Sequence, residues 1–155
     1  MPAMANQNQR LAQLSELIDR QIEAMGTLHA CLQAERRALD TRNAEELSEA
    51  AAGKSERLTV IGTLEQQRVR LVPDAQAMAS LCGSEPELAG RWRKLLELTA
   101  SCRDLNEANG TLIRWQRRRV EGTLGLLRGA SGPAIYGPDG GNQTGARVRT
   151  PLASA

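Results

Sequence analysis

One stretch of the sequence decides the fold: SEPELAGRWRKLLELTASCRDLNEANGTLIRWQRRRVEGTLGLL, residues 84–127. It opens with a helix start signal, because Ser84 is placed to cap the first turn and Glu87 stands at the capping-box spacing. Pro86 lies just inside the predicted start, and the next proline is Pro133. The stretch therefore predicts one helix of about forty residues, roughly 60 Å long at the α-helical rise.

Apolar side chains recur along this predicted helix at alternating steps of three and four residues. They are Leu88, Trp92, Leu95, Leu98, Cys102, Leu105, Leu112, Val120, Leu124 and Leu127. A single helix cannot bury such a stripe against itself, so it requires partner helices. The N-terminal half of the chain is predicted to supply them.

The first partner is predicted to begin near Asn6 or Asn8 and to end at Asp40. One heptad position in it is apolar in five consecutive repeats: Leu11, Ile18, Met25, Leu32 and Leu39. The second heptad position holds two apolar and two polar residues, namely Leu14, Leu28, Gln21 and Glu35. This repeat is typical of a coiled coil or a long bundle, and it leaves open whether the partner is the same chain or another.

A second helix is predicted after a short turn at residues 41–43. Asn43 is placed to cap it, and Pro73 to stop it, because the residue before a proline is pushed out of helical geometry. Its apolar residues are Leu47, Ala51, Leu58, Ile61, Leu64 and Val72. The short connection favours an antiparallel hairpin of the first two helices.

A brief third helix is predicted to link the hairpin to the long helix. Asp74 can cap its start, and Gly83 suits a left-handed residue that closes it. The expected fold class is therefore all-α: a long antiparallel helical hairpin or coiled-coil bundle, a short linker helix and one long C-terminal helix. This bundle domain is predicted to span residues 1–128.

The composition also favours long helices. Of 155 residues, 41% are apolar but only 2% are aromatic, with no Phe, so that Leu and Ala dominate. No run of 18 apolar residues occurs, and the polar N-terminus lacks the apolar centre of a secretion signal. A cytoplasmic protein without membrane insertion is expected.

Residues 129–155 differ in character from the rest. They are rich in Gly and Pro and poor in apolar side chains, which predicts a flexible tail that is disordered when free. Ile135 and Tyr136 stand alone in it, before a Gly-Pro-Asp-Gly turn. The sequence leaves open whether this tail folds back over the end of the long helix in the free protein.

Residues with catalytic potential form no recognisable constellation. Gly53, Lys54 and Ser55 are similar to the end of a phosphate-binding loop, but Ser48 stands where that loop needs glycine. We interpret Lys54 as a helix-surface or bundle-edge residue. His29 is the single histidine, without a companion ligand or nucleophile, and is interpreted as a surface residue beside the heptad stripe. No enzymatic activity, metal or cofactor is expected.

The three cysteines are far apart in the sequence, and none belongs to a CxxC pair. They are Cys31, Cys82 and Cys102. We interpret them as buried or half-buried thiols in a reducing compartment.

The net charge of +2 is unevenly distributed. Residues 1–90 carry 9 basic and 13 acidic side chains, a net charge of −4, whereas residues 91–128 carry 9 and 4, a net charge of +5. One dense basic cluster stands out: Arg114, Arg117, Arg118 and Arg119. It is a solvated face, a surface for an acidic protein partner or a nucleic-acid contact; the last is disfavoured because no nucleic-acid-binding motif accompanies it.

Asn106, Asn109 and Gly110 interrupt the apolar stripe of the long helix. Polar and small residues inside an interface can fix the helix register or permit a close crossing, and we predict one of these roles. The alternative is a tolerated surface patch.

Taken together, these elements resemble the FlgN-type flagellar export chaperones. The C-terminal half carries the resemblance through LNEANGTLI at residues 105–113, the arginine run at 117–119, and YGPDG at residues 136–140. The N-terminal half contributes Leu32, Glu35, Arg36, Ala38 and Leu39.

The resemblance implies a chaperone that binds hook–filament junction (hook-associated) proteins in the bacterial cytoplasm. Such a protein prevents their premature assembly and delivers them to the flagellar type III export apparatus, as a monomer or weak dimer. The resemblance also implies that the C-terminal region engages the helix-forming terminus of the client. On that basis the candidate client-binding residues are Leu112, Ile113, Val120, Leu124, Leu127, Ile135 and Tyr136.

The arginine cluster is the candidate contact for an acidic segment of the client or of the export machinery. An alternative function comes from a different class of protein. The heptads of the first helix would also suit a structural coiled-coil homodimer with no client.

Overall fold

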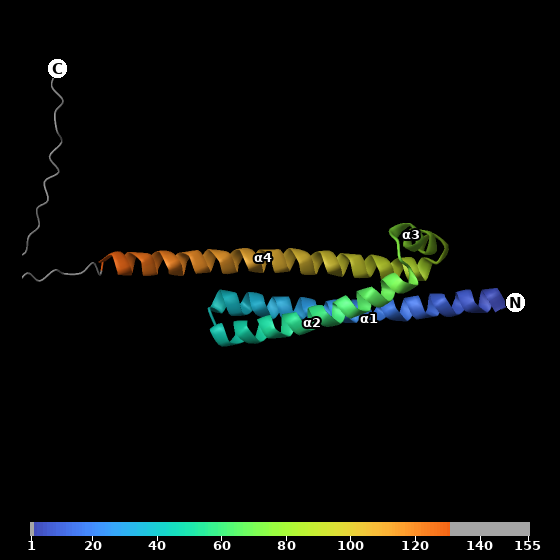
Figure 1. Ribbon diagram of the computed structural model, residues 1–155, viewed down its shortest axis with the longest axis horizontal. Coiled ribbons are helices and arrows are strands. Elements are labelled where there is room, and N and C mark those ends of the chain that lie inside the picture. Colours follow the sequence, from blue (N-terminus) through green and yellow to red (C-terminus); the bar gives the residue numbers. More distant parts are fainter. Residues whose placement is uncertain (1, 131–155) are drawn as a thin grey trace, which may run out of the picture. The chain divides into compact units, whose positions relative to one another are not determined.

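The structure is a computed structural model that describes residues 2–130, which form helices and no strand (Figure 1). The helices are α1 (Pro2–Thr41), α2 (Ala44–Leu71), α3 (Ala75–Ser84) and α4 (Pro86–Ala130). The all-α prediction and the predicted order of two helices, a short linker helix and one long helix are confirmed. The chain forms two compact units, Met1–Gln116 and Arg117–Ala155, and the boundary between them falls within α4.

The turn between α1 and α2 is built as the sequence predicts. Arg42 adopts φ 55°, in the left-handed region, and reverses the chain. The Oδ1 atom of Asn43 then accepts hydrogen bonds from the backbone N–H groups of Glu45 and Glu46, both at 3.1 Å. Asn43 is therefore the N-cap of α2, and its side chain satisfies donors that the first helical turn leaves unpaired.

Prolines set two further helix boundaries. α1 begins at Pro2, earlier than predicted, because proline is favoured at the first helical position and residues 3–5 are good helix formers. α2 ends at Leu71, as predicted: Val72 precedes Pro73 and is extended, with φ −137°.

The predicted boundary between α3 and α4 is wrong in its details. Ser84 does not cap α4; it is the last residue of α3, and its hydroxyl donates to the Leu81 carbonyl at 3.1 Å. Gly83 lies within α3 and does not close it. The break falls at Glu85, which is extended with φ −123°, because Pro86 follows it. With the proline imposing the break, no left-handed glycine is needed.

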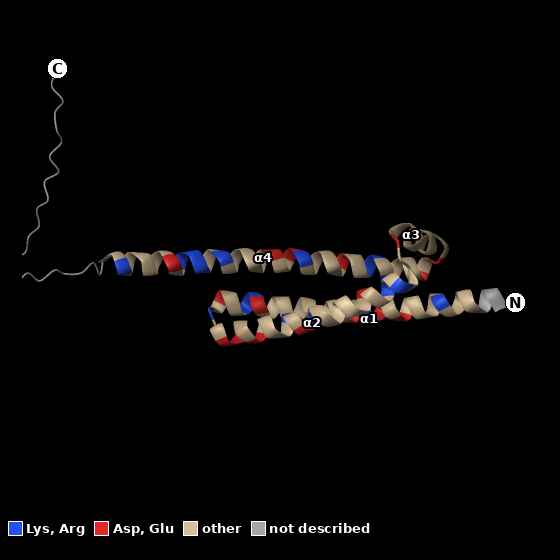
Figure 2. Cartoon of the chain, viewed as in Figure 1, with Lys and Arg blue, Asp and Glu red and all other residues tan. Residues whose placement is uncertain are grey.

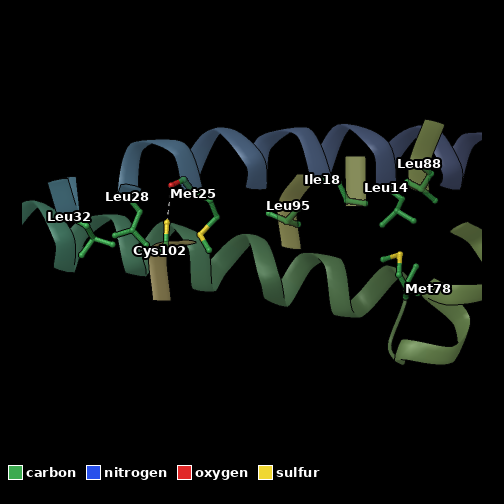
Figure 3. Packing of buried hydrophobic residues seen from close by; sticks show 10 residues of the cluster. Leu14, Ile18, Met25, Leu28, Leu32, Met78, Leu88, Leu95 and Cys102 are labelled. Atoms are coloured by element: carbon green, nitrogen blue, oxygen red, sulfur yellow. Dashed lines mark hydrogen bonds between the residues drawn. The ribbon is translucent and has the colours of Figure 1, made fainter. Parts of the chain in front are cut away.

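The core of the first unit forms around α1 (Figure 3). Its buried members come from α1, α3 and α4, together with Val72, which directly follows α2: Leu14, Ile18, Met25, Leu28, Leu32, Val72, Met78, Leu88, Leu95 and Cys102. Ile18 is 0% exposed and Leu32 is 1% exposed, so the heptad stripe predicted for α1 is the centre of the core. The bundle thus supplies, within one chain, the partners that this stripe needs.

The face predicted for α2 is partly wrong. Leu58 is 50% exposed, whereas Ala50 and Leu64 are buried. Ala50, Arg57 and Leu64 follow one another at seven-residue spacing and face the bundle, so Leu58 lies one residue past that seam. Ala51 is displaced from the seam in the same way and is exposed.

α1 and α2 run antiparallel, as the short turn predicts. The Cys31 thiol donates to the Ala50 carbonyl at 3.2 Å, near the turn. Further from the turn, Gln21 Nε2 donates to Glu65 Oε2 at 3.0 Å. Earlier residues of α1 thus meet later residues of α2.

α1 and α4 run parallel in a single register. Three α4 side chains, spaced seven residues apart, each donate a hydrogen bond to an α1 carbonyl. The pairs are Cys102 and Met25 (3.5 Å), Asn109 and Leu32 (2.9 Å), and Gln116 and Leu39 (3.1 Å). In each pair the two residues are 77 positions apart in the sequence, so the register between α1 and α4 is the same over these three contacts.

Asn109 is the centre of a polar network inside this interface. It is 0% exposed, and its Nδ2 atom donates both to the Leu32 carbonyl and to Glu35 Oε2, each at 2.9 Å. Lys54 of α2 donates to the other oxygen of that carboxylate, Glu35 Oε1, at 2.7 Å. The predicted interface role is therefore confirmed for Asn109, which binds α1 directly and is connected to α2 through Glu35.

The two neighbouring residues do not share that role. Asn106 is exposed and accepts a hydrogen bond from Lys54 at 3.3 Å. The close helix crossing predicted as one role for Gly110 is wrong, because a Cβ atom there would meet only the flexible end of Arg114, at 3.5 Å. The interface is therefore stabilised by the polar side chain of Asn109 and does not depend on the small size of Gly110.

α2 also contacts α4, through an arginine stacked on an aromatic ring. The Arg68 guanidinium lies 5.2 Å from the centre of the Trp92 ring, and its Nη2 atom binds Glu65 Oε1 at 2.6 Å. The hydrogen bond from Arg68 lowers the pKa of the Glu65 carboxyl below its ordinary 4.5, against the opposing effect of burial.

Replacing Asn109 with Ala is expected to lower the free energy of unfolding by about 1–3 kcal/mol, because a buried carbonyl and a buried carboxylate oxygen lose their donor. Asn106→Ala is the matched control, since it removes an exposed amide three residues away, with an expected change within about 0.5 kcal/mol. Urea denaturation followed by circular dichroism measures both values. Equal losses in the two variants would contradict the role assigned to Asn109.

The Glu65 carboxyl predicts a pH dependence of stability. Because its pKa is lower in the fold than when unfolded, its contribution is present above pH 4.5 and is lost as the pH falls through the folded pKa. The stability difference between the native chain and Glu65→Gln should therefore shrink on acidification. Arg68→Gln keeps the Glu65 carboxyl but removes the hydrogen bond that lowers its pKa most. This variant should therefore lose the same pH-dependent part of the free energy of unfolding. A difference that stays constant from about pH 6 to pH 3 would contradict this assignment.

Candidate protein-interaction surface on α4

The candidate client-binding residues are distributed over both units of the chain. In the first unit Leu112 is half-buried and Ile113 is exposed. In the second unit three apolar side chains are exposed: Val120 (58%), Leu124 (45%) and Leu127 (60%). Ile135 and Tyr136 lie outside the described residues. The structure thus brings Val120, Leu124 and Leu127 together on one short helical segment.

The described part of the second unit, residues 117–130, is entirely helical. Val120, Leu124 and Leu127 are spaced by four and three residues, so they share one face of that helix. We call this face the C-terminal stripe. Every side chain from residue 117 to residue 129 is exposed, which makes the C-terminal stripe accessible to a partner.

One further apolar side chain of this segment is not among the predicted client-binding residues. Leu126 is 77% exposed, more than any residue of the C-terminal stripe. Leu126 does not fit the three-and-four spacing of the stripe. The sequence signal for Leu126 is that it is a large apolar residue on a predicted helix at a position outside the buried apolar stripe.

The arginine cluster has members in both units, with Arg114 in the first and Arg117, Arg118 and Arg119 in the second. Figure 2 colours the Lys and Arg residues of α4 blue. In the first unit Arg114 donates to the Thr111 hydroxyl at 3.1 Å. In the second, Arg117 binds Glu121 one turn later, with its Nε atom 2.9 Å from Oε1. Exposed pairs of this kind contribute only about 0–1 kcal/mol, so fold stability does not explain the cluster. Arg117 and Arg118 are both exposed.

The residues considered for other chemistry have structural contacts. Lys54 is partly buried between Glu35 and Asn106, which confirms the bundle-edge interpretation. His29 lies beside the heptad stripe as predicted, but it is half-buried, with Nε2 3.1 Å from the Ser101 hydroxyl oxygen. It is not a plain surface residue, because α4 covers that edge of α1.

The thiols occupy the environments that the sequence predicts. Cys31 and Cys102 are buried, and Cys82 is half-buried. Burial raises the pKa of the Cys82 and Cys102 thiols, which disfavours the reactive thiolate. Over residues 2–130, no three His, Cys, Asp or Glu side chains gather in a way that would hold a metal ion. The same helices include none with the length and apolarity to cross a membrane.

A groove of about 530 Å³ opens in the first unit between the start of α1, the end of α2 and α3. Its lining is mostly apolar, with Leu14, Val72 and Leu81 among its walls. Arg10 lies at the groove and donates to the Leu71 carbonyl at 3.3 Å.

Comparison with known proteins connects this helical architecture to one family. The model of the family described as FlgN protein matches residues 4–144. The Flagella synthesis protein FlgN of Salmonella typhimurium is 33% identical over 132 residues, which cover 84% of this chain and 90% of that protein. The protein of the same name from Proteus mirabilis is 30% identical over the same coverage, and that from Escherichia coli K12 is 24% identical over 136 residues, 86% of this chain and 93% of that protein. No solved structure matches the chain.

Proposed function

Because the chain belongs to the FlgN family and has a role in flagellar assembly, we propose that it is an export chaperone for hook–filament junction proteins. It binds these clients in the bacterial cytoplasm, prevents their premature assembly and delivers them to the flagellar type III export apparatus. Binding and release, without covalent chemistry or a cofactor, are sufficient for this activity. The observation that supports it most directly is the exposed C-terminal stripe.

The C-terminal stripe has the properties of a helix-binding surface. Val120, Leu124 and Leu127 span two helical turns, which matches the i, i+4, i+7 pattern of amphipathic helix recognition. Each is roughly half exposed, so that covering it removes apolar area from water. At about 25 cal/mol per Å², each side chain would contribute on the order of 1 kcal/mol to client binding. Leu112 and Ile113 are proposed to contribute from the preceding turns of α4.

The arginines give the proposed client complex its electrostatic component. Arg117 and Arg118 lie in the same segment as the C-terminal stripe, and both are exposed. Positive charge at the rim of an apolar contact accelerates association with an acidic segment and disfavours basic competitors. Arg114 and Arg119 belong to the same proposed contact, with the client or with the export machinery.

The Gly- and Pro-rich residues that follow α4, within the predicted tail 129–155, are proposed to take part in client binding. Ile135 and Tyr136 are their candidate apolar anchors. Ordering such a segment on binding costs conformational entropy, which lowers the net affinity while widening the contact. A chaperone that must release its client at the export apparatus benefits from that balance.

The alternative, a homodimer through the heptads of α1, has less support. That seam is already occupied within the chain, since Ile18 and Leu32 are buried in the core of the first unit. A second copy would have to displace α2 or α4, together with the hydrogen bonds from Cys31 and Asn109. A monomer or weak dimer is therefore proposed.

Replacing Val120, Leu124 and Leu127 together with Ala is expected to weaken binding to a purified hook–filament junction protein at least tenfold, a loss of about 1.4 kcal/mol or more. The matched control is Leu58→Ala with Leu96→Ala, because each is 50% exposed and lies on the first unit. Isothermal titration calorimetry gives the affinities, and circular dichroism verifies that helicity is preserved.

Two outcomes would contradict different parts of the proposal. Unchanged affinity in the triple variant would mean that the client site lies elsewhere. Failure of the native chain to bind any junction protein would contradict the chaperone function itself. A chain ending at Gly129 tests the tail: retained capture would move the site entirely onto the helices.

A further inference from the structure

The helical segment 117–129 has two chemically different halves. At about 100° per residue, all four of its large apolar side chains fall on one half of the helix circumference. That half holds Leu126, Arg119, Thr123, Leu127, Val120 and Leu124. The other half holds three arginines, one glutamate and three glycines: Arg117, Arg128, Glu121, Gly125, Arg118, Gly129 and Gly122.

We propose that this segment is an interfacial helix that binds the surface of an anionic lipid bilayer. The helix lies along the bilayer with its apolar half in the headgroup region and its basic half toward water and the lipid phosphates. Such binding is peripheral, because the segment is far too short and too charged to span a bilayer. The inference rests on the residues of the segment and does not depend on the proposed client.

The width of the apolar half favours a lipid surface over a protein groove. A groove that accepts a helix contacts a narrow stripe, and Val120, Leu124 and Leu127 alone satisfy it. Leu126 lies about 120° around the helix from Val120, outside such a groove, yet it is 77% exposed. A flat interface covers about half of a helix that lies in it, and that half includes Leu126 as well as the C-terminal stripe.

The charge of the segment selects the type of lipid. Four arginines and one glutamate give residues 117–129 a net charge of +3. Arg117 and Arg128 stand beside Leu124 at the edge of the apolar half, where guanidinium groups meet lipid phosphates. Arg119 lies within the apolar half, and its long stem allows the charged end to reach the headgroups. Nucleic acid would use the arginines but leave the four apolar side chains unexplained.

The test is binding of the full-length chain to vesicles of two compositions. One set is pure phosphatidylcholine, and the other contains about one third phosphatidylglycerol, the anionic lipid. We expect binding at least tenfold tighter to the anionic vesicles in a co-flotation assay, with a loss of at least tenfold when the salt concentration rises from low to high. Equal binding to both sets, or none to the anionic set, would overturn the proposal.

Two variants with a matched control test the location of the site. Leu126→Gln and Arg128→Gln should each weaken binding to anionic vesicles severalfold, while Leu58→Gln, which alters an exposed leucine of the first unit, should not. Arg147→Gln with Arg149→Gln tests the two tail arginines and should retain binding. Loss of binding in this last variant, or retention in the first two, would overturn the assignment to α4.

Leu126 also distinguishes this proposal from the client site. It is absent from the C-terminal stripe, so Leu126→Gln should reduce vesicle binding and leave capture of a junction protein unchanged. Capture of an acidic peptide or RNA in place of anionic vesicles would overturn the lipid proposal without affecting the client proposal. Equal losses of client and vesicle binding in Leu126→Gln would contradict a lipid-specific role for this residue.

Discussion

The first unit depends on one buried carboxylate and the groups that neutralise it. Glu35 of α1 is 1% exposed, and it is bound by Lys54 from α2 and by Asn109 from α4. A buried charge without partners is strongly destabilising, so the three helices must meet at this point for the carboxylate to be tolerated. The hairpin and the long helix are thereby tied to the same level of the bundle.

This constraint also selects one helix register among several that the apolar residues would accept. α1 and α4 both repeat every seven residues, and a slip of one heptad would still place apolar rows opposite one another. It would, however, move Asn109 away from Glu35 and bring Cys102 or Gln116 to its level instead. Cys102 has a single weak S–H donor and cannot serve the Leu32 carbonyl and the carboxylate together, as Asn109 does. The polar pair therefore supplies specificity that leucines alone would not provide.

The features that could be predicted from the sequence are those fixed by local chemistry. Asn43 and Asp74 cap their helices as expected, because capping involves only the next three residues. The heptad of α1 likewise identified the core. The exposure of Leu58 could not be predicted, because it depends on how α2 is rotated against its partners. For the same reason the heptad pattern shows Glu35 as a polar residue at an otherwise partly apolar position, although it is the residue at which all three long helices meet.

The spacing of the apolar residues on α4 could be predicted from the sequence, but the exposure of Val120, Leu124 and Leu127 could not. At positions 102, 109 and 116 the heptad of α4 donates hydrogen bonds to α1, whereas the next member, Thr123, donates to Arg119 of its own helix at 3.0 Å. The seven-residue repeat continues in the sequence, but at Thr123 the hydrogen bond is made within α4. The periodicity of the sequence does not distinguish these two kinds of contact. Because the client and lipid proposals both use Val120, Leu124 and Leu127, the two partners would compete for one helix. If both proposals hold, client binding would release the segment from an anionic membrane, and client release would let the segment bind the membrane again.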